Sequence, residues 1–344
     1  MDFKNLNKPF IIAEMSGNHN NSLERALEIV EAAAKTGVDA LKIQTYTADT
    51  LTIDSDREEF LIKDSKSLWK GESLYSLYKK ASTPWEWHKP IYDKCKELGL
   101  ICFSTPFDFT AVDFLEELGN PIYKIASFEN ADIPLIKRVA QTKKPVIMST
   151  GMATLEELEE SVKTLEQNGC PQIVILKCTS TYPATPENTN LLTITDMQKR
   201  FPNCVIGLSD HTLGTAVAVA SVALGAKVIE KHFTLSRAQG GVDSAFSMEP
   251  AEMKALVNDS ADALKALGKV SYEVTEAEKP SLKFRRSLFV VKDIKKGEAL
   301  SAENIRSIRP AYGLAPKHYE AVLGKKAKTD LEKGTPLSFD LIED

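Results

Sequence analysis

Two of the five histidines in this sequence are spaced so that they could share a metal ion: His211 in GLSDHT and His232 in VIEKHF. Their separation equals one strand-plus-helix repeat, which places them at matching positions on adjacent parallel strands, where two imidazoles can bind one divalent cation. A single histidine is more often a satisfied core or surface residue, but two at the ends of neighbouring strands favour a metal. Two protein ligands leave positions for water and a substrate oxygen, as a Lewis acid requires.

Lysines and serines near the ends of the predicted strands form a second set. Ammonium and hydroxyl groups together can bind a phosphate and a carboxylate without a P-loop. Taken singly, each serine could instead cap the helix that follows it, and a strand-end lysine could form a Schiff base, as in lyases that cleave products of this chemistry. The set consists of Lys42, Lys124, Ser127, Ser149 and Ser209.

Two carboxylates complete the candidate chemistry. Glu14 ends the first apolar run, PFIIAEM. If the strands close into a barrel, the last strand neighbours the first and brings Glu14 close to His232, where we expect a general base. A buried ion pair with Lys42 is an alternative that does not exclude that role. Asp243 lies in the glycine-containing segment 236–250, which we interpret as a loop over a sugar, although Asp243 could simply be a turn residue or the start of a helix.

The elements that must position these residues are eight short apolar runs, which alternate with amphipathic segments from residue 9 to about 235. This alternation predicts a parallel sheet, and eight repeats favour an α/β fold of the closed (β/α)8 barrel type. No GxGxxG follows the first run, which counts against a dinucleotide-binding sheet. Active sites of such barrels lie at the carboxyl ends of the strands. The predicted strands are 9–15, 40–46, 100–107, 122–127, 145–150, 173–180, 204–210 and 228–234.

The segments between the strands carry helix start and stop signals. SLERALEIVEAAAKTG and TLEELEESVKTLEQNG each begin at a Ser or Thr and end at a Gly. The connection 47–83 is longer than usual and contains Trp69, so it is either a lid over the site or a structural excursion.

Residues 1–270 form the predicted barrel domain, 271–286 a linker, and 287–344 a small, mostly β domain with two similar segments, DIKKGEAL and DLEKGTPL. The net charge of −5 offers no general attraction to nucleic acid or to a membrane, and no apolar run reaches membrane-spanning length. Five scattered cysteines without CxxC spacing predict neither a disulfide framework nor a structural zinc site. We therefore expect a cytoplasmic protein.

The sequence resembles the sialic acid synthase family along nearly its whole length. The resemblance rests on IIAEMSGNHNNSLERALEIVEAA, KIQTY, FSTPFD, YKIASFE, KPVIMSTGMATLEE, LKCTSTYPATPE, GLSDHTLGTAVAVASVALGAKVIEKHFTL and RPAYGLAPKHYEAVLGKKA. It implies a (β/α)8 TIM barrel followed by an antifreeze-like (SAF, β-clip) domain, in a homodimer swapped so that this domain caps the partner's active site. The implied reaction condenses phosphoenolpyruvate with an amino-sugar aldehyde, assisted by Mn²⁺ or, as alternatives, Mg²⁺ or Co²⁺.

The resemblance also implies roles for individual residues. One position departs from it, because these synthases often have Asn where this chain has Ser180, which leaves that phosphate contact open. The implied set is His211 and His232 as metal ligands, Glu14 as general base, Lys42, Lys124, Ser127, Ser149, Ser180 and Ser209 as phosphoenolpyruvate contacts, Gln44, Glu129, Tyr182 and Asp243 as sugar contacts, and Arg309 as the arginine that the small domain sends into the neighbouring site.

Two further departures concern the sugar. The first segment reads AEMSGNHN instead of the more usual AE-x-G-x-NHNG, and the last loop reads GGVDSAFSMEP where sialic acid synthases tend to have GPDHKASLEP. The DSAFS form resembles the pseudaminic acid synthases, which use 2,4-diacetamido-2,4,6-trideoxy-L-altrose and serve flagellin glycosylation. Phe246 would then contribute an apolar wall for the C6 methyl and second acetamido groups. The alternatives are an N-acetylneuraminate or legionaminate synthase that uses a manno-configured sugar, and a non-catalytic carbohydrate-binding protein.

Overall fold

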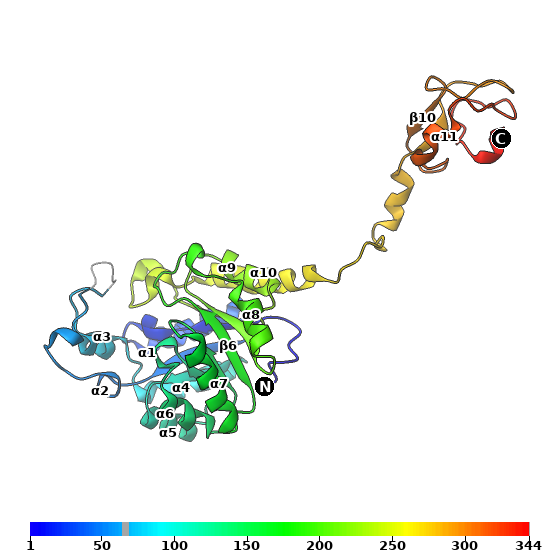
Figure 1. The fold of residues 1–344 in the computed structure, drawn as a ribbon. Helices are drawn as coiled ribbons and strands as arrows, with labels where there is room; N and C mark the ends of the chain where they lie inside the picture. Colours follow the sequence, from blue (N-terminus) through cyan, green and yellow to red (C-terminus); the bar gives the residue numbers. More distant parts are fainter. Residues whose placement is uncertain (64–68, 344) are drawn as a thin grey trace. The chain divides into compact units, whose positions relative to one another are not determined.

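The computed structural model describes residues 1–63 and 69–343 and divides the chain into two compact units, Met1–Gly268 and Lys269–Asp344. Residues 64–68 of the long connection lie outside the described residues. The first unit contains eight parallel strands that pair in chain order, and β8 closes the sheet by pairing with β1 (Figure 1). The strands are β1 (Phe10–Glu14), β2 (Ala40–Thr45), β3 (Ile101–Pro106), β4 (Tyr123–Ile125), β5 (Val146–Ser149), β6 (Ile173–Cys178), β7 (Val205–Asp210) and β8 (Val228–His232).

The closed barrel confirms the predicted fold class, and each predicted strand is present with ends that differ by at most 2 residues. Helices follow the strands along the chain and surround them (Figure 1). They are α1 (Leu23–Thr36), α2 (Ala48–Leu51), α3 (Leu74–Ala81), α4 (Trp85–Glu97), α5 (Phe109–Leu118), α6 (Ile133–Ala140), α7 (Leu155–Gln167), α8 (Thr193–Arg200), α9 (Ala216–Ala223) and α10 (Pro250–Leu267).

Two helices show how the local sequence sets these boundaries. Helix α1 begins at Ser22, whose side chain accepts a hydrogen bond from the Arg25 backbone N–H, and it ends at Gly37 with a φ of 86°. Helix α7 begins with a capping box in which Thr154 and Glu157 each accept from the other's backbone N–H. The predicted start signals are therefore the observed caps, which satisfy amides that a helix leaves unpaired.

The barrel interior changes character from one end of each strand to the other. Side chains that start the strands form an apolar cluster with Phe10, Ile12, Ala40 and Val228 among its members. Alternate positions further along these strands face the same way, so the inward side chains that follow are polar. Gly207 lies where the interior is most crowded, because a Cβ there would lie 2.2 Å from the Val228 carbonyl oxygen. An apolar plug thus supports a polar mouth at the carboxyl ends of the strands.

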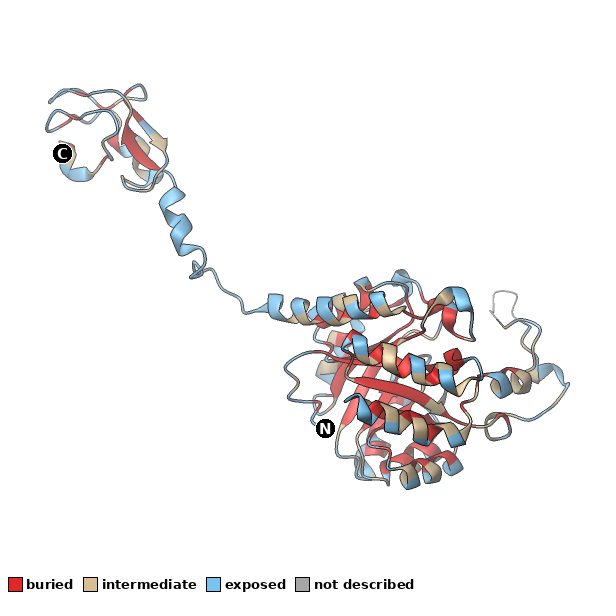
Figure 2. Cartoon of the chain, turned by 180° about the vertical axis from the view of Figure 1, so that it is seen from behind, coloured by how far each residue is buried: buried red, intermediate tan, exposed pale blue. Residues whose placement is uncertain are grey.

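Figure 2 shows the buried residues concentrated on the barrel strands and on the helix faces that pack against them. In the described part of the chain, every helix is too short or too polar to span a membrane. The barrel core is completed by two clusters between the sheet and its helices, which contain residues such as Ile29 and Ile136.

The second unit has its own small core. Strands β9 (Ser287–Val290) and β10 (Ile305–Ile308) pair antiparallel, and α11 (Tyr319–Val322) packs its Val322 into a cluster with residues such as Leu288 and Ile305. The predicted linker is not wholly irregular, since Lys279–Phe284 forms a 3-10 helix with no buried residue.

Candidate active site

Strand pairing brings Glu14 beside both Lys42 and His232. The register aligns Glu14 with Lys42 of β2 and with His232 of β8, as barrel closure predicts. The Lys42 Nζ lies 2.8 Å from Glu14 Oε2, so the buried ion pair considered from the sequence is present. Burial raises the pKa of Glu14, although Lys42 opposes this shift. A carboxylate whose pKa is raised toward neutrality is suited to accept a proton.

Glu230 lies between the two buried lysines. Its Oε1 is 3.7 Å from the Nζ of Lys42 and 3.7 Å from that of Lys124, and the Ser209 hydroxyl donates to it at 3.4 Å. Lys124 in turn donates to Ser149 Oγ at 2.7 Å. Three of the expected phosphoenolpyruvate contacts therefore meet around one carboxylate that the sequence analysis did not include in the site, and Ser149 joins them through Lys124. The position of Glu230 two residues before His232, on the same strand face, was the available signal.

The two lysines have different protonation behaviour. Burial tends to lower the pKa of Lys42, but Glu14 and Glu230 outweigh burial and raise it. Burial lowers the pKa of Lys124, which Glu230 only partly offsets. Burial would raise the pKa of Glu230, but the two ammonium groups hold it below its ordinary value. An incoming phosphate and carboxylate can therefore act as further partners of the two lysines in this row.

Ser127 and Ser180 approach each other across Gly151. A Cβ at Gly151 would lie 2.0 Å from Ser180 Oγ and 2.6 Å from Ser127 Oγ, so only glycine fits between them. The Gly151 backbone N–H donates to Ser127 Oγ at 3.2 Å. The two hydroxyls, which follow β4 and β6 and lie on either side of Gly151 after β5, form a concave set of the type that binds phosphate oxygens. Ser180 thus lies with the set despite its departure from the family pattern.

The histidine pair fits a metal ion in the chemistry of its donors. The rings of His211 and His232 lie with centroids 5.4 Å apart, and His211 Nδ1 lies 3.0 Å from the Thr179 carbonyl oxygen, which fixes the ring. His232 Nδ1 is buried without a hydrogen-bond partner and lies 3.6 Å from Asp243 Oδ2. Burial and the neighbouring cations hold the pKa of His232 well below its ordinary value, which favours the neutral form that a metal ligand requires. Across residues 1–63 and 69–343, no group of three or more His, Cys, Asp or Glu side chains has metal-binding geometry.

Cys178 is a second residue that the sequence analysis left out of the site. Its Sγ lies 4.0 Å from His211 Nδ1 and 3.9 Å from Ser180 Oγ. Burial alone would raise the pKa of this thiol, but the contact with His211 lowers it to about 7. The sequence gives one indication that Cys178 lies in the site: it ends β6 and is aligned with Ser209 of β7 in the sheet register.

Aromatic side chains form one wall beside the histidines. The Tyr182 ring lies 4.5 Å from His211 and 5.3 Å from Phe246, and Phe246 lies 4.9 Å from His232, all between centroids. Trp69 of the long connection lies 6.4 Å from Tyr182 and donates its indole N–H to the Val242 carbonyl oxygen at 3.2 Å. This connection therefore contacts the loop after β8, as a lid would.

Polar sugar-contact candidates are connected to Glu14 by hydrogen bonds. Gln44 donates its amide N–H to Glu14 Oε1 at 2.8 Å and to Ser16 Oγ at 3.2 Å, and the Ser16 hydroxyl donates to Asp243 Oδ2. Burial raises the pKa of Asp243, while the hydrogen bond from Ser16 opposes this shift. Glu14, Gln44, Ser16 and Asp243 therefore form one connected network next to His232.

Two predicted contacts stand apart from this network. Glu129 follows β4, and burial raises its pKa to about 7, with Lys124 opposing. Within residues 1–63 and 69–343 its buried Oε2 has no hydrogen-bond partner, which suits a group that meets a substrate donor. Arg309 is exposed within the second unit, close to β10. The structure of that unit by itself brings Arg309 to none of the other site residues.

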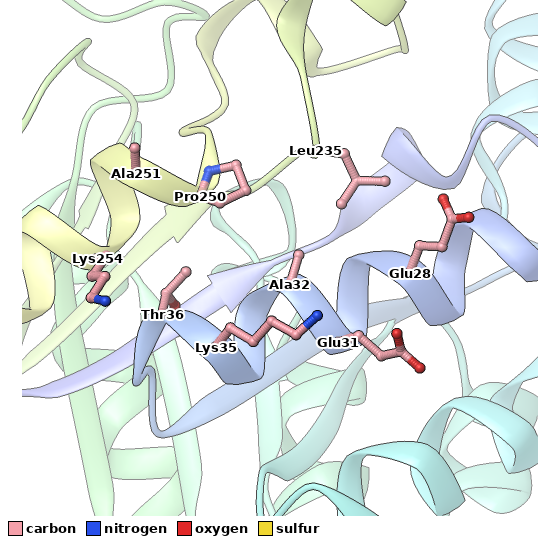
Figure 3. Close-up of a pocket in the computed structure, with 9 residues that line it drawn as sticks. All are labelled: Glu28, Glu31, Ala32, Lys35, Thr36, Leu235, Pro250, Ala251 and Lys254. Carbon is pink, nitrogen blue, oxygen red and sulfur yellow. The ribbon is translucent and has the colours of Figure 1, made fainter.

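A separate groove lies on the outer surface of the barrel between α1 and α10 (Figure 3). It has a volume of about 490 Å³ and shares no residue with the mouth of the barrel. Carboxylates, lysines and small apolar side chains line it together, among them Glu28, Ala32, Lys35 and Lys254. It contains no histidine, cysteine or hydroxyl cluster comparable with the site at the strand ends.

A closed eight-stranded barrel with buried lysines, carboxylates and paired histidines at its mouth, followed by a small β domain, defines a TIM-barrel enzyme. Comparison with protein families assigns residues 29–272 to the NeuB family and residues 285–343 to the SAF domain. The chain belongs to the NeuB family, and the predicted antifreeze-like domain is confirmed.

Similar proteins extend over almost the whole chain. The pseudaminic acid synthase of Campylobacter jejuni is 47% identical over 98% of this chain and 97% of its own length. That of Helicobacter pylori is 43% identical over 98% and 99%. Among solved structures, the N-acetylneuraminic acid synthetase of Leptospira borgpetersenii, in complex with citrate, superposes with a TM-score of 0.72 at 29% identity, covering 83% of this chain and 95% of that one. The family predicted from the sequence is therefore confirmed.

Proposed function

We propose that this protein is a pseudaminic acid synthase, which condenses phosphoenolpyruvate with 2,4-diacetamido-2,4,6-trideoxy-L-altrose to give pseudaminic acid and phosphate. The observation that carries the proposal is the buried row of Lys42, Glu230 and Lys124, with the hydroxyls of Ser149 and Ser209, beside a histidine pair. A substrate with a phosphate and a carboxylate fits the lysines and hydroxyls, and an aldehyde fits the histidine pair. Similarity to two pseudaminic acid synthases supports the choice of sugar.

The lysines bind and orient phosphoenolpyruvate in this mechanism. Its phosphate and carboxylate pair with Lys42 and Lys124, and the Ser127–Gly151–Ser180 concavity receives phosphate oxygens. This orientation presents C3 of the enolpyruvyl group to the sugar aldehyde. A carbon–carbon bond forms between C3 and the aldehyde carbon, and the aldehyde oxygen takes a proton to become a hydroxyl.

Positive charge then develops at C2, where the buried carboxylates stabilise it. Glu14 and Glu230 are fixed before the reaction by their lysine partners, and such preorganised groups stabilise charge more effectively than water does. Water adds at C2 and gives its proton to Glu14. The C2–O bond breaks, the new C2 hydroxyl passes its proton to the departing phosphate, and phosphate leaves with the bridging oxygen, so that a ketone remains at C2. The proton held by Glu14 balances the one taken up by the aldehyde oxygen.

His211 and His232 would hold the divalent ion, which we propose to be Mn²⁺. When bound, the ion supplies Lewis-acid activation of the aldehyde. The fixed orientation of His211 and the lowered pKa of the buried His232 ring support this assignment.

We further propose a homodimer in the cytoplasm. Its SAF domain carries Arg309 to the partner's sugar site, and the exposed apolar side chains that precede this domain, such as Val270 (92% exposed) and Tyr272 (99% exposed), favour burial against another surface. All five cysteines are free, which supports a reducing compartment.

The reaction type is tested by the fate of the bridging oxygen. Phosphoenolpyruvate labelled with ¹⁸O at C2–O should deliver the label to phosphate, and phosphate should appear only when the sugar is present. Label retained in the nonulosonate, or phosphate released equally without any sugar, contradicts the proposed reaction.

A further inference from the structure

Ser16 has an unusual backbone at the edge of the site. It follows Glu14 by two residues, is buried, and has a φ of 47°, in the left-handed region that L-residues other than glycine, asparagine and aspartate rarely adopt. Neighbours hold this conformation, because a Cβ on the next residue, Gly17, would lie 3.3 Å from both the Ala81 backbone and Val242 Cβ. Glycine would adopt this φ without strain, so the serine side chain must compensate for its backbone.

The Ser16 hydroxyl connects two of the sugar-contact candidates. It donates its single proton to Asp243 Oδ2 and accepts from Gln44 Nε2 at 3.2 Å. Because Gln44 Nε2 also donates to Glu14 Oε1 at 2.8 Å, both hydrogens of that amide point at protein acceptors. Gln44 can therefore address a substrate only through its carbonyl Oε1. Ser16 and Glu14 together set which way round this amide lies.

Ser16 also fixes the orientation of the Asp243 carboxylate. Asp243 opens the 3-10 helix Ser244–Phe246 in the loop after β8, and its backbone carbonyl accepts from Ser247 at 2.7 Å. The hydrogen bond from Ser16 ties the carboxylate of this loop to the end of β1. One Asp243 oxygen is thereby used by Ser16.

We propose that Ser16 is a specificity-determining positioning residue, which presents Gln44 and Asp243 as paired acceptors to hydroxyl and acetamido N–H donors of the sugar. A charge-assisted hydrogen bond of this kind is expected to alter the sugar KM or kcat/KM by roughly tenfold or more. Phosphoenolpyruvate binds at the lysine row, which Ser16 does not contact. This inference rests on the proposed function, which supplies the sugar.

The test compares Ser16→Ala with Ser16→Gly. The alanine variant loses the hydroxyl and keeps the strained backbone, whereas the glycine variant loses the hydroxyl and relieves the strain. We expect both to raise the sugar KM about tenfold while the phosphoenolpyruvate KM stays within about twofold. The glycine variant should melt at or above the wild-type temperature. Loss of affinity without loss of stability separates positioning from a structural role.

A matched control is Asn190→Gly. Asn190 has a φ of 46°, almost the same as Ser16, but it is exposed before α8. Asn190→Gly should leave the KM values of both substrates unchanged. A wild-type sugar KM in Ser16→Gly, or an equal rise in the KM values of both substrates, overturns the inference. The proposed function fails separately if the wild type does not use the altrose sugar, and the variants are then compared on the sugar that the wild type accepts.

Discussion

Glu230 is expected to matter for stability in the free enzyme and less so once phosphoenolpyruvate is bound. In the structure it is the common partner of Lys42 and Lys124, at 3.7 Å from each ammonium. Glu230→Gln keeps the shape of the side chain and removes its charge. Two buried ammonium groups then share Glu14 as their remaining nearby carboxylate in this row.

The cost follows from the geometry. At 3.7 Å and an effective dielectric constant near 20, each pair is worth about 4 kcal/mol before desolvation is counted. Breaking a buried ion pair on one side typically destabilises a protein by about 3–5 kcal/mol. For a unit that spans Met1–Gly268, about 1 kcal/mol corresponds to roughly 2 °C, so the melting temperature should fall by about 6–10 °C.

Phosphoenolpyruvate should repair this defect. Its phosphate and carboxylate supply the negative charge that Glu230→Gln lacks, so the ligand-induced rise in melting temperature should be several degrees larger in the variant than in the wild type. Differential scanning calorimetry with and without phosphoenolpyruvate measures both quantities.

Asp210→Asn is the matched control for this experiment. Asp210 forms a buried ion pair with Lys231 at 2.8 Å on the neighbouring strands, but Lys231 is held by the Thr212 and Gly214 carbonyls and lies outside the row. This variant should lose stability with no extra gain from phosphoenolpyruvate. A melting temperature within about 1 °C of wild type in Glu230→Gln, or an unchanged ligand response, refutes the reasoning.

Four further predictions concern separate features. Burial lowers the pKa of His19 and His88 to about 4, so the unfolded chain binds more protons between their ordinary value of 6.5 and pH 4. Their contribution to the free energy of unfolding is complete above pH 6.5 and is lost as the pH falls, by about 2 kcal/mol each at pH 5. Urea unfolding should show that His88→Gln loses about 2 kcal/mol less stability than the wild type between pH 7 and pH 5. An equal loss in the variant and the wild type contradicts this prediction. Gly151→Ala should raise the phosphoenolpyruvate KM by about tenfold or more, because the new Cβ would overlap Ser127 and Ser180, and an unchanged KM would exclude the phosphate concavity. His211→Ala should abolish metal-dependent turnover and Mn²⁺ binding by calorimetry while the far-ultraviolet circular dichroism spectrum is retained; undiminished Mn²⁺ binding excludes the ligand assignment. Arg309→Ala should raise the sugar KM by about tenfold if the SAF domain reaches the partner's site, and wild-type kinetics would remove Arg309 from it.

Much of the barrel could be predicted because its signals are local. Apolar runs define the strands, and Ser22, Gly37 and Thr154 mark the helix ends where the structure has them. The convergence of Glu14, Lys42 and His232 also followed from sequence, since closure of a parallel barrel fixes which strand ends are neighbours.

Other features depend on distances that no local pattern contains. Glu230 was visible as a strand-end residue, but only the packed barrel shows it between two lysines. The left-handed backbone of Ser16 and its bond to Asp243 join residues 227 positions apart. The Cys178 contact with His211 likewise arises from strand register and the local bend after β6. These contacts are set by tertiary packing, so the residue types alone could not reveal them.

The most direct test of the central claim is phosphate release from phosphoenolpyruvate with Mn²⁺ and each of three sugars. These are 2,4-diacetamido-2,4,6-trideoxy-L-altrose, N-acetylmannosamine and the 6-deoxymannose diacetamido sugar. We predict turnover with the altrose sugar and little with either manno sugar. Preference for a manno sugar would contradict the proposed substrate, and release with none of the three would contradict the proposed synthase activity.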